Sequence, residues 1–354
     1  MRLLLDITAH GFGHLSQTAL IISALRRRRP NLSLVVRSGL DPQILAARLG
    51  PSIETWPSDT DFGCVMDGPF RVDRQRTFFR YQELFDRLDR VVDGIAKGLQ
   101  RHSIDAVFSN ISFPVLIAAR QCGTPSVACS SLIWSEMAEF YFQGIADSKP
   151  IVEGMRAAYD TATGLVALTP GMPMSGHQPA RVQQPIGRRG RNRRGELISR
   201  LGGDAATRVL LWAFGGMQPN PPPYLRAVSN TLSLGPSSWG DSVISADGLG
   251  WPFEDLIASC DVVISKPGYG IVVELGANAK PNILLSRGDW PEEPHLIEWL
   301  KKVAPCRLVS SSENVDASSF SQMISEVLAE PTKSPAAVGG EDQVVDLCRQ
   351  FWAI

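Results

Sequence analysis

The chain has 354 residues, of which 44% are hydrophobic, and its formal net charge is −1. A chain of this length predicts two domains, and the balanced charge excludes an overall field that would attract nucleic acid. The apolar runs are too short to span a bilayer, so we expect no transmembrane segment.

The N-terminal residues and the cysteines indicate the compartment. Residues 1–7 soon reach an acidic residue, Asp6, and then run into a glycine loop, which predicts a first strand and not a signal peptide. The six cysteines are scattered without a C-x-x-C pair, which argues for reduced thiols and against a zinc site. We therefore expect a cytoplasmic protein; a peripheral membrane contact has no support in the sequence.

The first half of the chain alternates strands and helices. Apolar and β-branched runs predict strands at residues 2–7, 32–37, 104–109, 125–129 and 165–168, and helical periodicity predicts helices at residues 15–29, 83–101 and 114–121. Residues 59–76 are polar and irregular and predict a loop. This βα alternation predicts a parallel, doubly wound sheet, which binds ligands beyond the carboxyl ends of its strands.

Several polar side chains fall at those predicted strand ends. His14 follows the first strand in a loop with Gly11 and Gly13, and Asn110 and Ser131 follow two later strands, with Trp134 close behind. We expect these residues on the acceptor side of a binding site. A histidine at this place also suits a simpler role, in which it caps the helix or bonds a backbone carbonyl.

Residues 170–201 differ in composition from the flanking segments. They contain four prolines and a basic cluster from Arg188 to Arg194, which is typical of a linker with a solvated surface. We predict a first domain at residues 1–169, this linker, a second domain at residues 202–335, and a terminal segment at residues 336–354 whose helix packs back on the first domain.

The second half repeats the pattern of the first. It predicts strands at residues 208–214, 242–246, 262–264, 282–285 and 306–309, and helices at residues 255–259, 271–279, 295–302 and 342–352. Each half opens with a strand that runs into glycines. Two such domains predict a cleft between them as the default ligand site.

The stretch from Asp261 to Ala277 predicts a phosphate site. A buried strand, a turn with Gly268 and Gly270, and a helix place free backbone N–H groups and the positive end of a helix dipole at one point. Lys266 adds a positive charge. Glu274 lies one helical turn inside, where a carboxylate suits neighbouring hydroxyls such as those of a ribose. An ordinary βα turn without a ligand gives the same pattern.

The chain resembles GT-B fold glycosyltransferases, which have two Rossmann-like domains facing each other across a cleft. Five motifs carry the resemblance, in the family's order: His10-Gly-Phe-Gly-His14, Leu168-Thr-Pro-Gly171, Phe214-Gly-Gly216, Lys266-Pro-Gly-Tyr-Gly270 with Glu274, and Arg287-Gly-Asp-Trp-Pro-Glu-Glu-Pro294. Within the family they most resemble the glycosyltransferase-like N-terminal region of plant L-arabinokinase and its free-standing bacterial relatives. A weaker similarity is to the N-acetylglucosaminyltransferase that acts on the peptidoglycan lipid precursor.

The resemblance implies roles for individual residues. The donor diphosphate would lie on Lys266, Gly268, Tyr269 and Gly270, and the ribose on Glu274. Three further implied roles are a donor-sugar contact at Glu292 and Glu293, a border of the nucleobase at Trp251 and Phe253, and a base at His14. The family's retaining members have a glutamate where this chain has Lys266, which favours inversion.

Inverting transfer needs a base, donors for the leaving diphosphate and a held sugar. His14 suits the first task by its ordinary pKa. No D-x-D motif follows a strand, so we expect no metal and no cofactor beyond a nucleotide-sugar donor, first of all a UDP-linked one. The sequence leaves two alternatives open: a nucleotide-sugar hydrolase or epimerase, and a non-catalytic nucleotide-sugar-binding protein, which the short 216–261 segment favours. For Glu292 and Glu293 the alternative is an exposed pair that starts a helix.

Overall fold

The computed structural model describes residues 1–216, 219–225, 228–310 and 315–353. Chain contacts divide it into two compact units: unit 1 has residues 1–67, 72–186 and 339–354, and unit 2 has residues 68–71 and 187–338. Residues 170–186 of the expected linker thus belong to unit 1, and residues 187–201 belong to unit 2. The described residues contain no helix long and apolar enough to cross a membrane.

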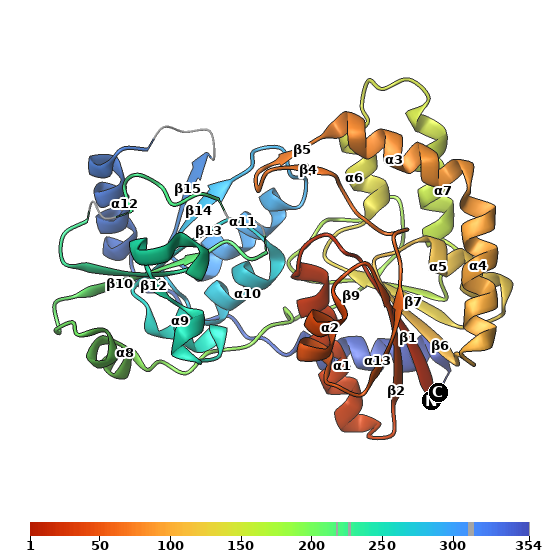
Figure 1. The fold of residues 1–354 in the computed structure, drawn as a ribbon, viewed down its shortest axis with the longest axis horizontal. Helices are drawn as coiled ribbons and strands as arrows, with labels where there is room; N and C mark the ends of the chain where they lie inside the picture. Colours follow the sequence, from red (N-terminus) through yellow and green to blue (C-terminus); the bar gives the residue numbers. More distant parts are fainter. Residues whose placement is uncertain (217–218, 226–227, 311–314, 354) are drawn as a thin grey trace. The chain divides into compact units, whose positions relative to one another are not determined.

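Unit 1 is built on a parallel sheet with strand order β3-β2-β1-β6-β7-β8-β9 in the described residues (Figure 1). The strands are β1 (Arg2–Ile7), β2 (Ser33–Ser38), β3 (Ile53–Pro57), β6 (Ala106–Asn110), β7 (Ser126–Ser130), β8 (Gly164–Ala167) and β9 (Ala180–Arg181). The order reverses between β1 and β6, which is the switch point where doubly wound sheets bind ligands. The predicted parallel, doubly wound class is confirmed.

The helices of unit 1 bury their apolar faces against this sheet and each other. They are α1 (Gly13–Arg28), α2 (Pro42–Leu49), α3 (Arg74–Asp86), α4 (Leu88–Arg101), α5 (Pro114–Gln121), α6 (Trp134–Tyr141), α7 (Ser148–Tyr159) and α13 (Gly340–Trp352). The C-terminal helix α13 lies beside α1 in Figure 1, and Arg28 at the end of α1 donates to Asp342 of α13 at 3.1 Å. The terminal helix is therefore part of unit 1.

Unit 2 has a second parallel sheet, with order β12-β11-β10-β13-β14-β15 in the described residues. Its strands are β10 (Arg208–Ala213), β11 (Thr231–Gly235), β12 (Ile244–Ser245), β13 (Val262–Ser265), β14 (Asn282–Ser286) and β15 (Cys306–Ser310); its helices are α8 (Arg194–Leu201), α9 (Phe253–Ser259), α10 (Tyr269–Ala277), α11 (Glu293–Val303) and α12 (Ala317–Ala329), with 3-10 turns η1 (Ser237–Ser242) and η2 (Asp247–Leu249). The order again reverses, here between β10 and β13, so both units have Rossmann-like winding.

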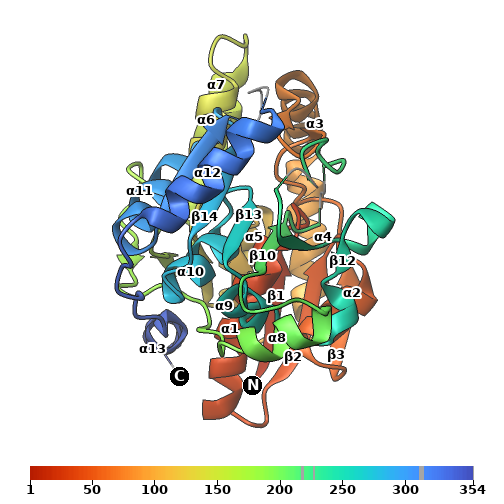
Figure 2. The same ribbon diagram turned by 90° about the vertical axis from the view of Figure 1, so that its left-hand side faces the viewer.

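The segment at residues 216–261 is short because the connections between its strands are short. Its described residues still form the strands β11 and β12. A parallel crossover usually carries a helix, yet the described residues between β10 and β11 form only turns. An aromatic cluster packs there instead. It includes Trp212 of β10 and Phe214, which follows the strand, and Trp212 lies 5.8 Å from Trp239 and 5.4 Å from Phe320 of α12, between ring centroids. Figure 2 shows α12 along β14 on this sheet.

Several predicted boundaries were wrong. The single helix predicted at residues 83–101 is two helices, α3 and α4, that meet at Arg87, and the loop predicted at residues 59–76 contains the short strands β4 (Met66–Asp67) and β5 (Arg71–Val72) and the start of α3. Asp73 starts α3 early because its carboxylate accepts from the backbone N–H of Arg76 at 2.9 Å. The strand predicted at residues 242–246 is shortened to β12, because a 3-10 turn occupies its beginning.

Candidate functional site

The turn between β1 and α1 holds His14 at the switch point of unit 1. Helix α1 begins without a side-chain cap and without an acidic residue in its first turn. Gly11 adopts a left-handed φ of +70°, and a Cβ built on Gly11 or Gly13 would meet no atom within 4 Å. Unit 1 therefore does not need glycine at Gly13 to avoid a clash, and both positions leave open space beside the helix N-terminus.

His14 is buried and bonded to a side-chain amide. Its Nδ1 lies 2.8 Å from Oδ1 of Asn110, the last residue of β6. Burial lowers the pKa of His14 to about 4, against the opposing effect of the Asn110 hydrogen bond. Thr18 donates to the His14 carbonyl at 2.8 Å, as expected one helical turn on. His14 is therefore neutral at physiological pH, and its imidazole does not cap α1.

The other predicted acceptor-side residues lie around His14, but they are buried. Asn110, Ser131 and Trp134 are each at most 1% exposed. The Trp134 ring lies 5.8 Å from the His14 ring and 5.7 Å from the His10 ring, between centroids. The structure thus brings these residues together, with the amide and hydroxyl groups behind His14 and the two glycines at the surface.

A buried acid, Asp61, completes this end of unit 1. It accepts a hydrogen bond from the Thr8 hydroxyl, and Thr8 in turn accepts from the backbone N–H of Ile111 at 3.0 Å. Burial raises the pKa of Asp61 to about 7 despite the Thr8 hydrogen bond. Beside it, Arg37 and Asp6 form a buried ion pair at 2.6 Å. Sequence reasoning missed Asp61 because it lies in the predicted loop, where nothing signals burial.

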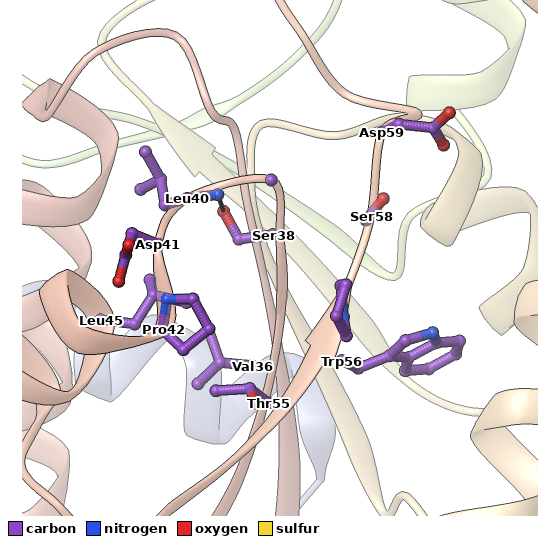
Figure 3. Close-up of a pocket in the computed structure, with 12 residues that line it drawn as sticks. Val36, Ser38, Leu40, Asp41, Pro42, Leu45, Thr55, Trp56, Ser58 and Asp59 are labelled. Carbon is purple, nitrogen blue, oxygen red and sulfur yellow. Dashed lines mark hydrogen bonds between the residues drawn. The ribbon is translucent and has the colours of Figure 1, made fainter.

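A cavity of about 530 Å³ opens farther along the same edge of unit 1. Figure 3 shows Asp41, Pro42 and Leu45 of the α2 region on one side, and Thr55 and Ser58 from β3 and the residues after it on the other. The indole of Trp56 points away from the cavity and covers Gly98 of α4. Gly39 in this wall packs closely: a Cβ built on it would lie 2.8 Å from the Ser58 carbonyl and 3.1 Å from Ala9.

The turn between β13 and α10 is the matching element of unit 2. Helix α10 begins after Gly268 without a side-chain cap and without an acidic residue in its first turn. Neither Gly268 nor Gly270 has a left-handed φ, and a Cβ built on either would meet no atom within 4 Å. Neither the backbone conformation nor packing within unit 2 requires these glycines. They leave room for another molecule to approach the backbone N–H groups at the start of α10.

Two cations surround this helix N-terminus. Desolvation, together with the positive charge of Arg287, lowers the pKa of Lys266 to about 8, which Glu293 partly offsets. Arg287 donates to the carbonyl of Pro267 at 3.0 Å and to Glu293 at 2.6 Å, and it stacks 4.1 Å from the Trp290 ring centroid. Arg287 therefore ties the glycine turn to the end of β14. The sequence placed Arg287 in a motif but gave it no role.

The acidic pair after Trp290 is buried, and one member has a full set of partners. Both oxygens of Glu293 accept hydrogen bonds, from Arg287 Nε at 2.6 Å and from Ser286 at 2.8 Å. Glu292 accepts from the Trp290 indole at 3.2 Å. The alternative of an exposed pair is wrong, since the two residues are 4% and 2% exposed. Glu274 is partly exposed on α10, and Tyr269 is buried.

The two aromatic residues predicted near the nucleobase lie at the start of α9. The guanidinium of Arg193 lies 3.8 Å from the centroid of the Trp251 ring and covers one face of it. Phe253 is 41% exposed. Arg194 of the basic cluster pairs with Asp261 at 2.8 Å, and Arg193 bonds Glu196 at 2.6 Å. Part of the basic cluster is thus engaged inside unit 2.

Comparison with known proteins places the fold. No family model matches the chain. L-arabinokinase of Arabidopsis thaliana is 25% identical over 311 residues, which is 83% of this chain and 29% of that protein, so the chain spans less than a third of this relative. Among solved structures, CalG4, the calicheamicin glycosyltransferase, has a TM-score of 0.64 at 13% identity and covers 100% of this chain and 94% of its own.

Two further structures agree. A UDP-glucosyltransferase from Polygonum tinctorium that glucosylates indoxyl has a TM-score of 0.64 at 12% identity, covering 100% of this chain and 98% of its own. The glycosyltransferase VinC in complex with dTDP has a TM-score of 0.56 at 13% identity, covering 100% and 95%. The chain has the GT-B fold of these glycosyltransferases over its whole length.

Proposed function

We propose that this chain is a glycosyltransferase that moves a sugar from a nucleotide-sugar donor to an acceptor hydroxyl, with inversion and without a metal. The observation that carries the proposal is the β13–α10 turn. An uncapped helix N-terminus, two glycines with open space around them and the partly buried Lys266 meet at the switch point of a Rossmann-like sheet. Free N–H groups and positive charge at such a point suit a diphosphate.

The donor would lie on unit 2. Its diphosphate accepts from the N–H groups at Gly268 to Gly270 and pairs with Lys266, and its ribose hydroxyls donate to Glu274. Glu293 is committed to Arg287 and Ser286. We therefore assign Glu293 to holding Arg287 against the turn, and leave the sugar contact to Glu292. The nucleobase border at Trp251 and Phe253 uses the exposed ring of Phe253 beside the Trp251 ring.

The reaction follows from these roles. The acceptor oxygen attacks the anomeric carbon as its proton passes to Nε2 of His14. The bond from that carbon to the diphosphate oxygen breaks on the opposite side, which inverts the configuration. The leaving diphosphate keeps the electron pair, and its charge is stabilised by Lys266 and the α10 N–H groups.

The cavity in unit 1 supports a proposal for the acceptor class. Its walls include Leu40, Pro42, Leu45 and Pro57, so it suits the apolar body of a small hydroxyl-bearing molecule. Replacing Leu40 at its rim with Asp should raise the acceptor KM and leave donor binding unchanged. An unchanged acceptor KM would place the acceptor elsewhere.

A product assay tests the proposal. The protein is incubated with UDP-, dTDP-, GDP- and ADP-sugars, with and without a panel of apolar phenols and alcohols. We expect release of the nucleoside diphosphate that depends on the acceptor, together with a new glycoside. Free sugar formed without acceptor would show a hydrolase, and binding without any product would show a non-catalytic protein. Glu274→Ala should weaken nucleotide binding by about tenfold or more, because it removes a charged acceptor of hydroxyl groups.

A further inference from the structure

A series of hydrogen-bonded side chains leads from His14 into unit 1. His14 and Gln17 lie three residues apart in α1, so they share one face of the helix. Asn110 lies between them: its Oδ1 is 2.8 Å from Nδ1 of His14, and its Nδ2 donates to Oε1 of Gln17 at 3.0 Å. The amide Nε2 of Gln17 then donates to the Ser131 hydroxyl at 2.9 Å.

One hydrogen bond in this series of side chains can run in only one direction. The backbone carbonyl of His14 accepts and never donates, and Nδ2 of Asn110 lies 3.4 Å from it. The Asn110 amide therefore directs Nδ2 to this carbonyl and to Gln17, and directs Oδ1 to the imidazole. Since Oδ1 only accepts, Nδ1 of His14 must carry a proton. In a neutral ring the lone pair is then on Nε2.

We infer that Asn110 and Gln17 are positioning residues that hold neutral His14 with its proton on Nδ1 and its lone pair on Nε2. Among the described residues no hydrogen bond occupies Nε2, so this nitrogen is the one available to another molecule. If the Asn110 amide turned over, its Nδ2 would face Nδ1, the proton would move to Nε2, and Nε2 would no longer accept. The His14 carbonyl opposes this reversal because it would then face Oδ1, a second acceptor, and the hydrogen bond from Asn110 to Oε1 of Gln17 would also be lost.

Only the last step of the inference rests on the proposed function, in which Nε2 takes the acceptor proton. A carboxylate at this place would both orient the ring and stabilise its protonated form. The Asn110 amide orients the ring without adding charge. The site therefore suits a neutral base, and two uncharged side chains, Asn110 and Gln17, fix the tautomer of that base.

Nitrogen NMR of the intact chain tests the inference without substrate. The five histidines are labelled with ¹⁵N, and His14→Gln identifies the ring signals of His14. At pH 7 we expect a proton on Nδ1 and an unprotonated Nε2. Gln17→Leu should give a mixture of tautomers or the reverse one, whereas Gln17→Glu keeps an oxygen facing Asn110 and should preserve the wild-type tautomer. Melting temperatures and amide spectra confirm that each variant is folded.

Each outcome decides the question. A proton on Nε2 in the wild type, or an unchanged tautomer in folded Gln17→Leu, would overturn the inference. If Gln17→Leu does not fold, the wild-type and Gln17→Glu spectra still decide it. With a working substrate pair, kcat of Gln17→Leu should fall by about ten- to a hundredfold at unchanged donor KM, as when partners that orient a histidine are removed. The expected tautomer in a protein without transfer activity would reject the proposed function and leave the inference standing.

Discussion

The β1–α1 turn of unit 1 and the β13–α10 turn of unit 2 occupy matching places in their sheets but carry different side chains. Each lies beside the switch point of its sheet, each helix begins without a side-chain cap or an early acid, and each turn has glycines in open space. In unit 1 the first helical turn carries a buried neutral histidine. In unit 2 the turn is flanked by Lys266 and Arg287. We propose that the first of these turns serves a base and the second an anion.

On this proposal the side chains, and not the position of the turn at the end of a strand, give the two turns different roles. Unit 1 surrounds His14 with groups that donate and accept hydrogen bonds without charge, so burial keeps the imidazole neutral. Unit 2 keeps its cations, Lys266 and Arg287, beside the backbone N–H groups at the start of α10. Substitutions that separate these two roles therefore test the whole account.

The largest effect is expected at His14. Replacing His14 with Ala should lower turnover by about 10²–10⁴-fold, the usual contribution of a general base. Nucleotide affinity should stay near the wild-type value, because the proposed donor contacts lie on unit 2. Steady-state kinetics with the substrate pair from the product assay measure turnover, and calorimetry measures nucleotide affinity. Wild-type turnover in folded His14→Asn would reduce the residue to a structural role.

The pH dependence of stability should separate His14 from Asp61. The folded pKa of His14, about 4, is below its ordinary value of 6.5, so the unfolded chain binds more protons between these values, and this residue lowers stability as the pH falls from 6.5 to 4. The folded pKa of Asp61, about 7, is above its ordinary value of 3.8, so this residue lowers stability as the pH rises from 4 to 7. The two effects oppose each other, at up to about 1.4 kcal/mol per pH unit each.

Denaturant unfolding between pH 4 and pH 8 measures this opposition. Relative to wild type, His14→Gln should gain stability toward acid, and Asp61→Asn should gain stability toward neutral pH, because Asn resembles the protonated carboxyl. Parallel curves for the two variants and the wild type would show that neither group titrates as the structure indicates.

The next effect concerns Lys266. Lys266→Met should weaken nucleoside diphosphate binding by about ten- to a hundredfold, since a hydrogen bond to a charged group contributes about 1.5–3 kcal/mol. Its pKa of about 8 also predicts that wild-type affinity is steady below pH 8 and falls above it, as the ammonium loses its proton. Calorimetric titrations at several pH values check both. If the nucleotide affinity of Lys266→Met depends on pH as that of the wild type does, the pH dependence comes from another group.

The smallest effect compares two glycines of α10. Gly270→Ala should leave the fold intact or stabilise it by up to about 1 kcal/mol, because its Cβ meets nothing and Ala favours a helix. It should still weaken nucleotide binding, by about tenfold. Gly276→Ala is the matched control: its Cβ would lie 2.4 Å from Trp299, so it should lower the melting temperature. Full nucleotide affinity in Gly270→Ala would place the phosphates elsewhere.

The sequence predicted the parts of the fold that local pattern determines. The predicted strand at residues 2–7 and helix at residues 114–121 match β1 and α5, because each has one uninterrupted apolar pattern. Strand β3 was missed because its sequence, Ile-Glu-Thr-Trp-Pro, has no continuous apolar run and mostly partly exposed or exposed side chains. The break between α3 and α4 was missed because no proline or glycine marks it.

The sequence predicted which residues belong to the candidate site, but not which of them contact each other. Glycine spacing indicated His14, Gly268 and Gly270, since a motif along the chain is visible in sequence. Asp61 and Arg287 depend on contacts between separate segments and gave no local signal. Gln17 was also missed, because its role depends on Asn110 from β6, which lies between Gln17 and His14 only in the folded chain.

One calorimetric experiment tests the central claim most directly. UDP and dTDP are titrated into the wild-type chain, Lys266→Met and His14→Gln under the same conditions. The account predicts saturable binding to the wild type, a loss of at least tenfold in Lys266→Met, and little change in His14→Gln, because the nucleotide is held by the β13–α10 turn and the base lies in unit 1. No binding to the wild type, or binding lost in folded His14→Gln and kept in Lys266→Met, would contradict it.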